Sequence, residues 1–141
     1  MNTRLSLSDE LRKLIESKLE QTLIGIEATF GQILRNQDIT PVELKENIKN
    51  LEENFSIISQ KWSLEILYTL LLKERAGFGE IKKILVVNSR TLSDKLKTLN
   101  YYNYVNRKVD DGPPLRVQYS LTDKGKNTVL LALPLLYYSS K

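Results

Sequence analysis

Two short helical patterns separated by three residues constrain the fold of this sequence more than any other feature. Between residues 78 and 99, apolar side chains recur at helical spacing before and after Val86-Val87-Asn88. The segment therefore predicts a helix of about eight residues, a tight turn and a second helix over about 89–99. The apolar faces are formed by Phe78, Ile81, Ile84 and Leu85 in the first helix and by Leu92, Leu96 and Leu99 in the second.

The second of these helices has an apolar and a polar face. The polar face carries Arg90, Ser93, Asp94 and Lys97. We expect Ser89 to be the N-cap, which leaves N–H groups of the first turn available to an anion such as a phosphate. A helix of this length spans roughly 16 Å and can lie in a DNA major groove about 12 Å wide. An ordinary surface helix of a small bundle is the alternative.

Positive charge is concentrated in the second half of the chain. Residues 1–60 carry a net charge of −3, whereas residues 61–141 carry +7. Between residues 82 and 108, one acidic side chain, Asp94, stands among seven basic ones: Lys82, Lys83, Arg90, Lys95, Lys97, Arg107 and Lys108. Such a patch favours a polyanionic partner, with a solvated basic face as the alternative.

Cysteine and histidine are both absent from the sequence. Their absence removes disulfides, thiol nucleophiles and cysteine-based zinc sites, together with the usual general base of enzymes. The acidic pairs Glu52-Glu53 and Asp110-Asp111 have no base, metal ligand or phosphate-binding loop beside them, so solvated charge explains them better than catalysis. We therefore expect no enzyme activity, no cofactor and no metal.

The first 55 residues predict a helical arm. Ser8 is a candidate cap for a long helix that ends near Arg35, and Thr40-Pro41-Val42-Glu43 has the composition of a capping box that starts a second helix. We expect this second helix to end near Asn54, before a hinge over 55–59. The long helix has more apolar surface than a small domain covers, so we expect it to face a partner, with intramolecular packing as the alternative.

A buried helix over about 61–73 is expected next, and a hairpin follows the two short helices. The runs 104–109 and 115–121 alternate like strands around the turn-forming segment 110–114. On the second run the inner face is expected to hold Leu115, Val117, Tyr119 and Leu121, while Asn106, Lys108 and Arg116 point outward.

Thr122-Asp123 is expected to cap a C-terminal helix that Pro134 kinks or divides. The concentrated apolar content of this helix favours a dimer interface shared with the first helix. Its apolar run over 129–138 is too short to span a bilayer, and residues 1–6 lack the hydrophobic core of a signal peptide. We expect no membrane association and a cytoplasmic location.

Four motifs mark residues 57–133. They are Gln60-Lys61-Trp62-Ser63 followed by Ile66, Leu67 and Leu70; Phe78-Gly79-Glu80-Ile81; RTLSDKLKTL over 90–99; and GPPLRVQYSLTDKG over 112–125. Together they resemble the HxlR-type branch of the winged helix-turn-helix regulators, next to the MarR and PadR regulators. The resemblance implies a mainly α fold with a small β-hairpin wing, preceded here by an extended N-terminal helical arm. The expected domains are a helical extension over 1–56, used for dimerisation, and a winged helix-turn-helix domain over 57–141.

Three positions depart from the family pattern. Gln60 stands where the family has glycine before Lys-Trp, and Asn103 replaces a glycine after the recognition helix, where asparagine is the natural second choice. Leu115 is an extra residue at the tip of the wing. The missing cysteine also excludes the thiol switch of some relatives.

The resemblance implies a homodimeric regulator of transcription that binds double-stranded DNA. The recognition helix over about 89–99 would enter the major groove with Ser89, Arg90, Ser93, Asp94 and Lys97. Arg90 is the candidate for a bidentate guanine contact, and Asp94 either accepts from cytosine or holds Arg90. The remaining DNA-binding candidates are Lys82, Lys83 and Lys95 on phosphates, and Lys108 and Arg116 of the wing, over about 104–121, on the backbone or minor groove.

Two alternatives remain at this point. Lys95 borders the apolar face, where its stem could pack while the ammonium stays in water. The whole domain could instead serve as a protein–protein interaction module without specific DNA binding, its acidic N-terminal helices holding the partner. The sequence points to no particular small-molecule effector.

Overall fold

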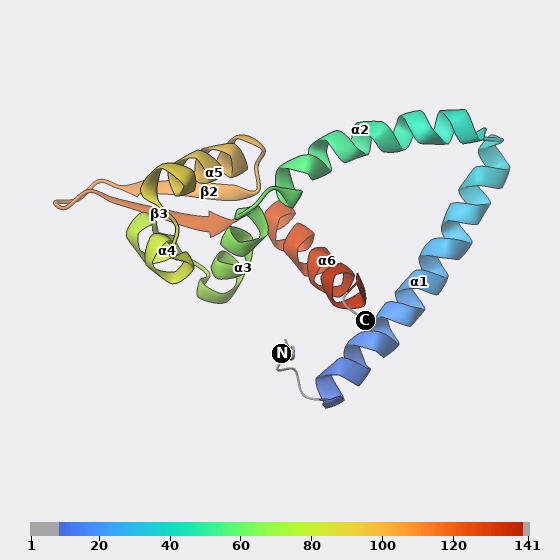
Figure 1. Cartoon of the computed structure of the whole chain (residues 1–141), viewed down its shortest axis with the longest axis horizontal. Helices are drawn as coiled ribbons and strands as arrows, with labels where there is room; N and C mark the ends of the chain where they lie inside the picture. Colours follow the sequence, from blue (N-terminus) through green and yellow to red (C-terminus); the bar gives the residue numbers. More distant parts are fainter. Residues whose placement is uncertain (1–8, 140–141) are drawn as a thin grey trace. The chain divides into compact units, whose positions relative to one another are not determined.

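The computed structural model describes residues 9–139 and is mainly helical (Figure 1). Its elements are, in chain order, α1 (Asp9–Gln37), α2 (Pro41–Ser59), α3 (Ser63–Lys73), β1 (Ala76–Gly77), α4 (Phe78–Leu85), α5 (Ser89–Tyr101), β2 (Val105–Asp110), β3 (Arg116–Leu121) and α6 (Asp123–Ser139). The chain divides into two compact units, Met1–Ile48 and Lys49–Lys141. The functional division at residues 56 and 57 stays a prediction. Among the described helices, none has the length and apolarity needed to cross a membrane.

The predicted capping box at the start of α2 is confirmed. The Glu43 N–H donates to Thr40 Oγ1 at 3.2 Å, and the Thr40 N–H donates to Glu43 Oε2 at 3.3 Å. The predicted end of this helix near Asn54 is wrong, because α2 continues to Ser59. Neither glycine nor proline interrupts 55–59, and burial of Ile57 in the core of the second unit favours the extra turn. Ser8, the candidate cap of α1, lies outside the described residues.

The helix predicted over 61–73 begins two residues later, at Ser63. Trp62 has a left-handed backbone with φ 77°, so it cannot belong to the helix, and its N–H donates to Glu65 Oε2 at 3.1 Å. The buried Ser63 Oγ donates to the Ile57 carbonyl oxygen at 2.9 Å and joins the end of α2 to the start of α3.

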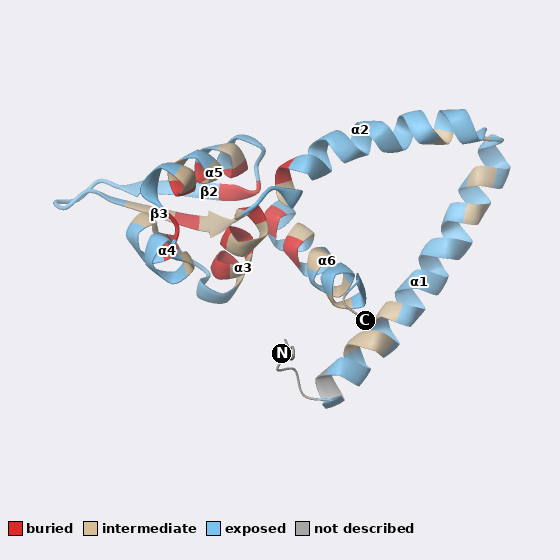
Figure 2. Cartoon of the chain, viewed as in Figure 1, coloured by how far each residue is buried: buried red, intermediate tan, exposed pale blue. Residues whose placement is uncertain are grey.

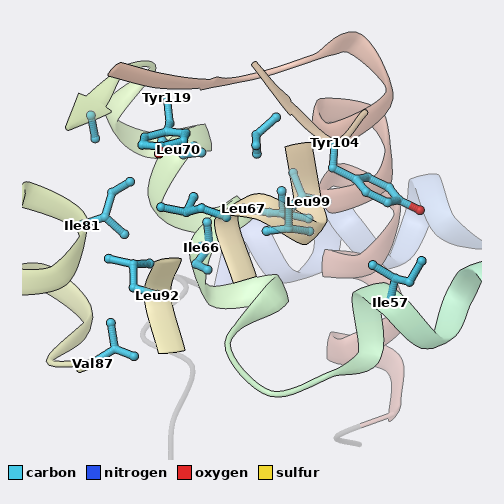
Figure 3. Close-up of a cluster of buried hydrophobic side chains, with 14 residues drawn as sticks. Ile57, Ile66, Leu67, Leu70, Ile81, Val87, Leu92, Leu99, Tyr104 and Tyr119 are labelled. Carbon is cyan, nitrogen blue, oxygen red and sulfur yellow. The ribbon is translucent and has the colours of Figure 1, made fainter. Parts of the chain in front are cut away.

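Most of the core lies between α3, α4, α5, α6 and the sheet (Figure 3). The fully buried hydrophobic side chains there include Ile66, Leu67, Leu70, Ile81, Leu92, Leu96, Leu99, Val105 and Val129. Figure 2 shows that buried residues gather in the second unit, whereas α1 is exposed over most of its length. The prediction that Ile84 faces the core is wrong: in so short a helix, Leu85 packs against the core and Ile84 is half exposed.

The sheet has three antiparallel strands in the order β1-β3-β2. The predicted hairpin is confirmed, with Val105 opposite Leu121 and Asp110 opposite Arg116. Strand β1 was not predicted. The inward orientation predicted for Leu115 is wrong: it precedes β3, beyond the reach of the core, and its side chain is 67% exposed.

The C-terminal end of α5 and the start of α6 follow the predicted local signals. Asn103 adopts the left-handed conformation, with φ 66°, and the Tyr104 N–H donates to the Leu99 carbonyl oxygen at 2.8 Å. Thr122 Oγ1 accepts from the Gly125 N–H at 2.9 Å and so caps α6. Pro134 does not divide this helix, which continues to Ser139.

Candidate nucleic-acid interface

The turn between α4 and α5 presents the first turn of α5 to solvent. The predicted N-cap Ser89 is wrong: Asn88 has an extended backbone, and its Oδ1 accepts from the Thr91 N–H at 2.8 Å. The buried Val87 precedes Asn88, so the chain leaves the core at Asn88, and α5 begins at the next residue, Ser89. Ser89 and Arg90 therefore lie in the first turn of α5, and both are exposed.

Two lysines from α4 border the same turn. Lys82 and Lys83 are exposed in the last turn of α4, and the Val86 N–H donates to the Lys82 carbonyl oxygen at 2.9 Å, which ends the helix. A shallow, open hollow is lined by Gly79, Lys82, Lys83, Val86, Val87 and Asn88. The structure thus brings two ammonium groups together with the start of α5, an arrangement that suits an anionic backbone.

The polar face of α5 continues along the helix as predicted. Arg90, Asp94 and Lys97 are exposed and Ser93 is half-buried, opposite the buried leucines. Asp94 and Arg90, which are both in the described part of the chain, form no ion pair with each other. The guanidinium of Arg90 is therefore available to a ligand, and Asp94 contributes a carboxylate to the same face.

Lys95 is half-buried and is held by a residue distant in sequence. Its Nζ donates to Gln60 Oε1 at 2.7 Å, which connects α5 to the turn before α3. Unlike Lys82 and Lys83, it already has a protein partner. Lys95 therefore has a contact within the protein and is also a candidate phosphate contact.

The hairpin carries basic side chains along its length, and Arg116 stands beside acidic side chains at the tip. Lys108 lies opposite Gln118, and Arg116 lies opposite Asp110, so both basic side chains share one face of the hairpin. Arg107 is exposed on the other face, opposite Tyr119. Asp110 and Asp111 are exposed where the two strands join, so they reduce the positive charge that Arg116 brings to the tip.

Three residues of this surface were missed by the sequence analysis. Asn88 was passed over because the adjacent serine is an equally good cap by composition. Gln60 was recognised only as a departure from glycine, and its contact with Lys95 joins residues 35 positions apart. Val86 lies in the predicted turn, but its left-handed backbone does not follow from its residue type.

Comparison with known proteins decides the family. A sequence model described as "HxlR-like helix-turn-helix" matches residues 57–136. The chain belongs to this family. Its HxlR-like domain contains every element from α3 to β3 and most of α6, whereas α1 and most of α2 lie outside the match.

Curated relatives of the HxlR-like domain carry names of regulators. YvaP of Bacillus subtilis is 38% identical over 82 residues, covering 57% of this chain and 75% of YvaP. A protein of Halalkalibacterium halodurans, BH0655, is 36% identical over 88 residues, covering 58% of this chain and 78% of that protein. Both are named as HTH-type transcriptional regulators. The relatives are regulators of transcription and not enzymes, as the sequence analysis expected.

Solved structures share the fold. The reduced form of the regulator YodB from B. subtilis has a TM-score of 0.57 at 24% identity and covers 72% of this chain and 91% of YodB. The diamide-treated form has a TM-score of 0.53 at 28% identity, covering 64% of this chain and 87% of that protein. The winged helix-turn-helix fold of this chain is confirmed, and the chain is a helix-turn-helix transcriptional regulator.

Proposed function

We propose that this regulator binds double-stranded DNA in a sequence-specific manner as a homodimer and acts in the cytoplasm. The observation that carries the proposal is the exposed first turn of α5: Arg90 forms no ion pair with a described carboxylate, and the cap Asn88 lines one hollow with Lys82 and Lys83. In this arrangement α5 lies in the major groove and Arg90 donates two hydrogen bonds to a guanine. Lys82 and Lys83 contact phosphates, and the wing contacts the backbone or minor groove.

The same surface contains the other predicted contacts. In this proposal Ser89, Ser93, Asp94 and Lys97 face the bases from α5, and the Asp94 carboxylate accepts from a cytosine amino group. Lys95 contacts a phosphate only if it gives up its bond to Gln60. Lys108 and Arg116 reach the DNA from one face of the wing.

The proposed dimer rests on two apolar helix faces. Residues 127–139 of α6 contain no charged side chain, and five leucines there are exposed: Leu130, Leu131, Leu133, Leu135 and Leu136. On α1, Leu23, Ile26, Phe30 and Ile33 are exposed at alternating spacings of three and four residues, which is typical of helices that pair along a seam. Apolar faces of this extent mark interaction sites, and a second copy of the chain supplies matching faces.

The test is a titration of Arg90→Ala on a cognate duplex and on random duplexes. We expect a loss of about 1 to 3 kcal/mol on the cognate duplex, with most of the non-specific binding retained. Arg75→Ala removes another exposed arginine, between α3 and β1, and is the matched control with no change expected.

Two results would contradict the proposal. An equal loss of Arg90→Ala on cognate and random duplexes would remove the base-reading role of Arg90. Failure of the wild-type protein to shift any duplex at low salt, where phosphate contacts are strongest, would favour a module that binds proteins.

A further inference from the structure

Val86 combines two features that are unfavourable for valine. It lies between α4 and α5 with φ 53° and ψ 51°, a left-handed backbone in which β-branched side chains are genuine outliers. Its side chain is also 86% exposed. Among the described residues with positive φ, the others are Asp38, Trp62, Glu74 and Asn103, none of which is β-branched.

Folding of the turn does not require a valine at this position. The hydrogen bond that ends α4 uses only the Val86 backbone N–H, and the apolar contact of the turn with the core comes from the buried Val87. Glycine would adopt the same conformation without strain and would expose no methyl groups to water. The isopropyl group of Val86 is therefore explained better by an external contact than by the stability of the domain.

The surroundings of Val86 indicate the chemistry of that contact. Its side chain lines the hollow that also contains Lys82, Lys83 and Asn88, and the exposed Arg90 follows four residues later. An apolar group on a basic surface suits a ligand that is anionic overall but offers an apolar group of its own. In the major groove of DNA, the 5-methyl group of thymine is that group.

We propose that Val86 is a specificity-determining residue that contacts the 5-methyl group of a thymine in each half-site. The inference rests on the proposed function, because it requires α5 to lie in the major groove. Binding of DNA then supplies the apolar contact that the free protein lacks, and recognition of thymine complements the guanine contact of Arg90.

The experiment removes the methyl group from the DNA and the isopropyl group from the protein separately. Each thymine of a bound duplex, obtained by selection from a random pool, is replaced in turn by deoxyuridine, and affinities are measured for wild type, Val86→Gly and Val86→Ala. We expect one position per half-site at which deoxyuridine weakens wild-type binding about fourfold, the effect of one buried methyl group. At that position, each Val86 variant should bind the thymine duplex and the deoxyuridine duplex with the same affinity.

The two variants and one control separate the possible outcomes. Val86→Ala keeps Cβ, so it answers the question even if the glycine loosens the turn. Leu72→Ala removes an exposed leucine on α3 and should keep the wild-type deoxyuridine profile. Profiles of the Val86 variants that match wild type would overturn the inference and leave the proposed function standing, whereas absence of binding to any duplex would overturn both.

Discussion

Gly125 is the position at which a single added methyl group should disturb the HxlR-like domain most clearly. It lies in the first turn of α6, and a Cβ at this residue would meet the Tyr104 carbonyl oxygen at 2.0 Å and its carbonyl carbon at 3.0 Å. One backbone hydrogen bond crosses the same contact: the Thr122 N–H donates to the Tyr104 carbonyl oxygen at 3.2 Å, while the Thr122 hydroxyl donates to the Asn103 carbonyl oxygen at 2.6 Å. The substitution Gly125→Ala must therefore separate α6 from the segment that joins α5 to β2.

The size of the effect follows from these distances. Ordinary contact begins near 3.4 Å, so the two backbone segments must move apart by about 1.4 Å. Overpacking of this kind destabilises by about 1 to 3 kcal/mol, and weakening of the backbone hydrogen bond adds about 1 kcal/mol. The better helix propensity of alanine offsets about 1 kcal/mol. We expect Gly125→Ala to lower the free energy of unfolding by about 1 to 3 kcal/mol.

Urea unfolding followed by Trp62 fluorescence measures this change in the second compact unit, Lys49–Lys141. Trp62 is the single tryptophan of the chain and lies just before α3, in the same compact unit as Gly125. Gly79→Ala is the matched control: its Cβ would meet nothing within 4 Å in α4, so alanine should stabilise by up to about 1 kcal/mol. Equal shifts for the two variants, or a Gly125→Ala protein as stable as wild type, would refute the reasoning.

Three further predictions concern the wing, the dimer and pH. Replacing Asp110 and Asp111 by asparagine should strengthen binding to every duplex by on the order of 1 kcal/mol at low salt, measured by fluorescence anisotropy; unchanged affinity would mean that the tip stays away from DNA. Leu131→Glu should convert dimers to monomers in sedimentation experiments, whereas Leu72→Glu, at a leucine that is more exposed but lies on α3, should leave them dimeric. Burial raises the pKa of Tyr104, so the unfolded chain loses the phenolic proton at a lower pH than the folded chain. The free energy of unfolding should therefore fall as the pH rises above 10. Tyr104→Phe should reduce this fall, measured by urea unfolding.

Much of the fold was predictable because its signals are local. The spacing of Leu92, Leu96 and Leu99 predicted the buried face of α5, and the composition of 110–114 predicted the hairpin turn. The same holds for the reciprocal hydrogen bonds of Thr40 and Glu43 and for the left-handed Asn103, because both depend on residues within a few positions of each other.

The features that were missed depend on partners distant in sequence or on strain. Strand β1 has only two residues, Ala76 and Gly77, and exists because it pairs with Tyr119 and Gln118. The contact between Lys95 and Gln60 requires the packing of α5 against α3. No propensity places valine in a left-handed turn, so the conformation of Val86 could be learned only from the structure.

Selection of bound duplexes from a random pool by the wild-type protein tests the central claim most directly. Sequence-specific binding by a two-fold dimer predicts enrichment of a palindrome whose half-sites lie about 34 to 36 Å apart, centre to centre. Recovery of a pool with the same sequence composition as the starting pool, even at low salt, would contradict sequence-specific recognition by α5.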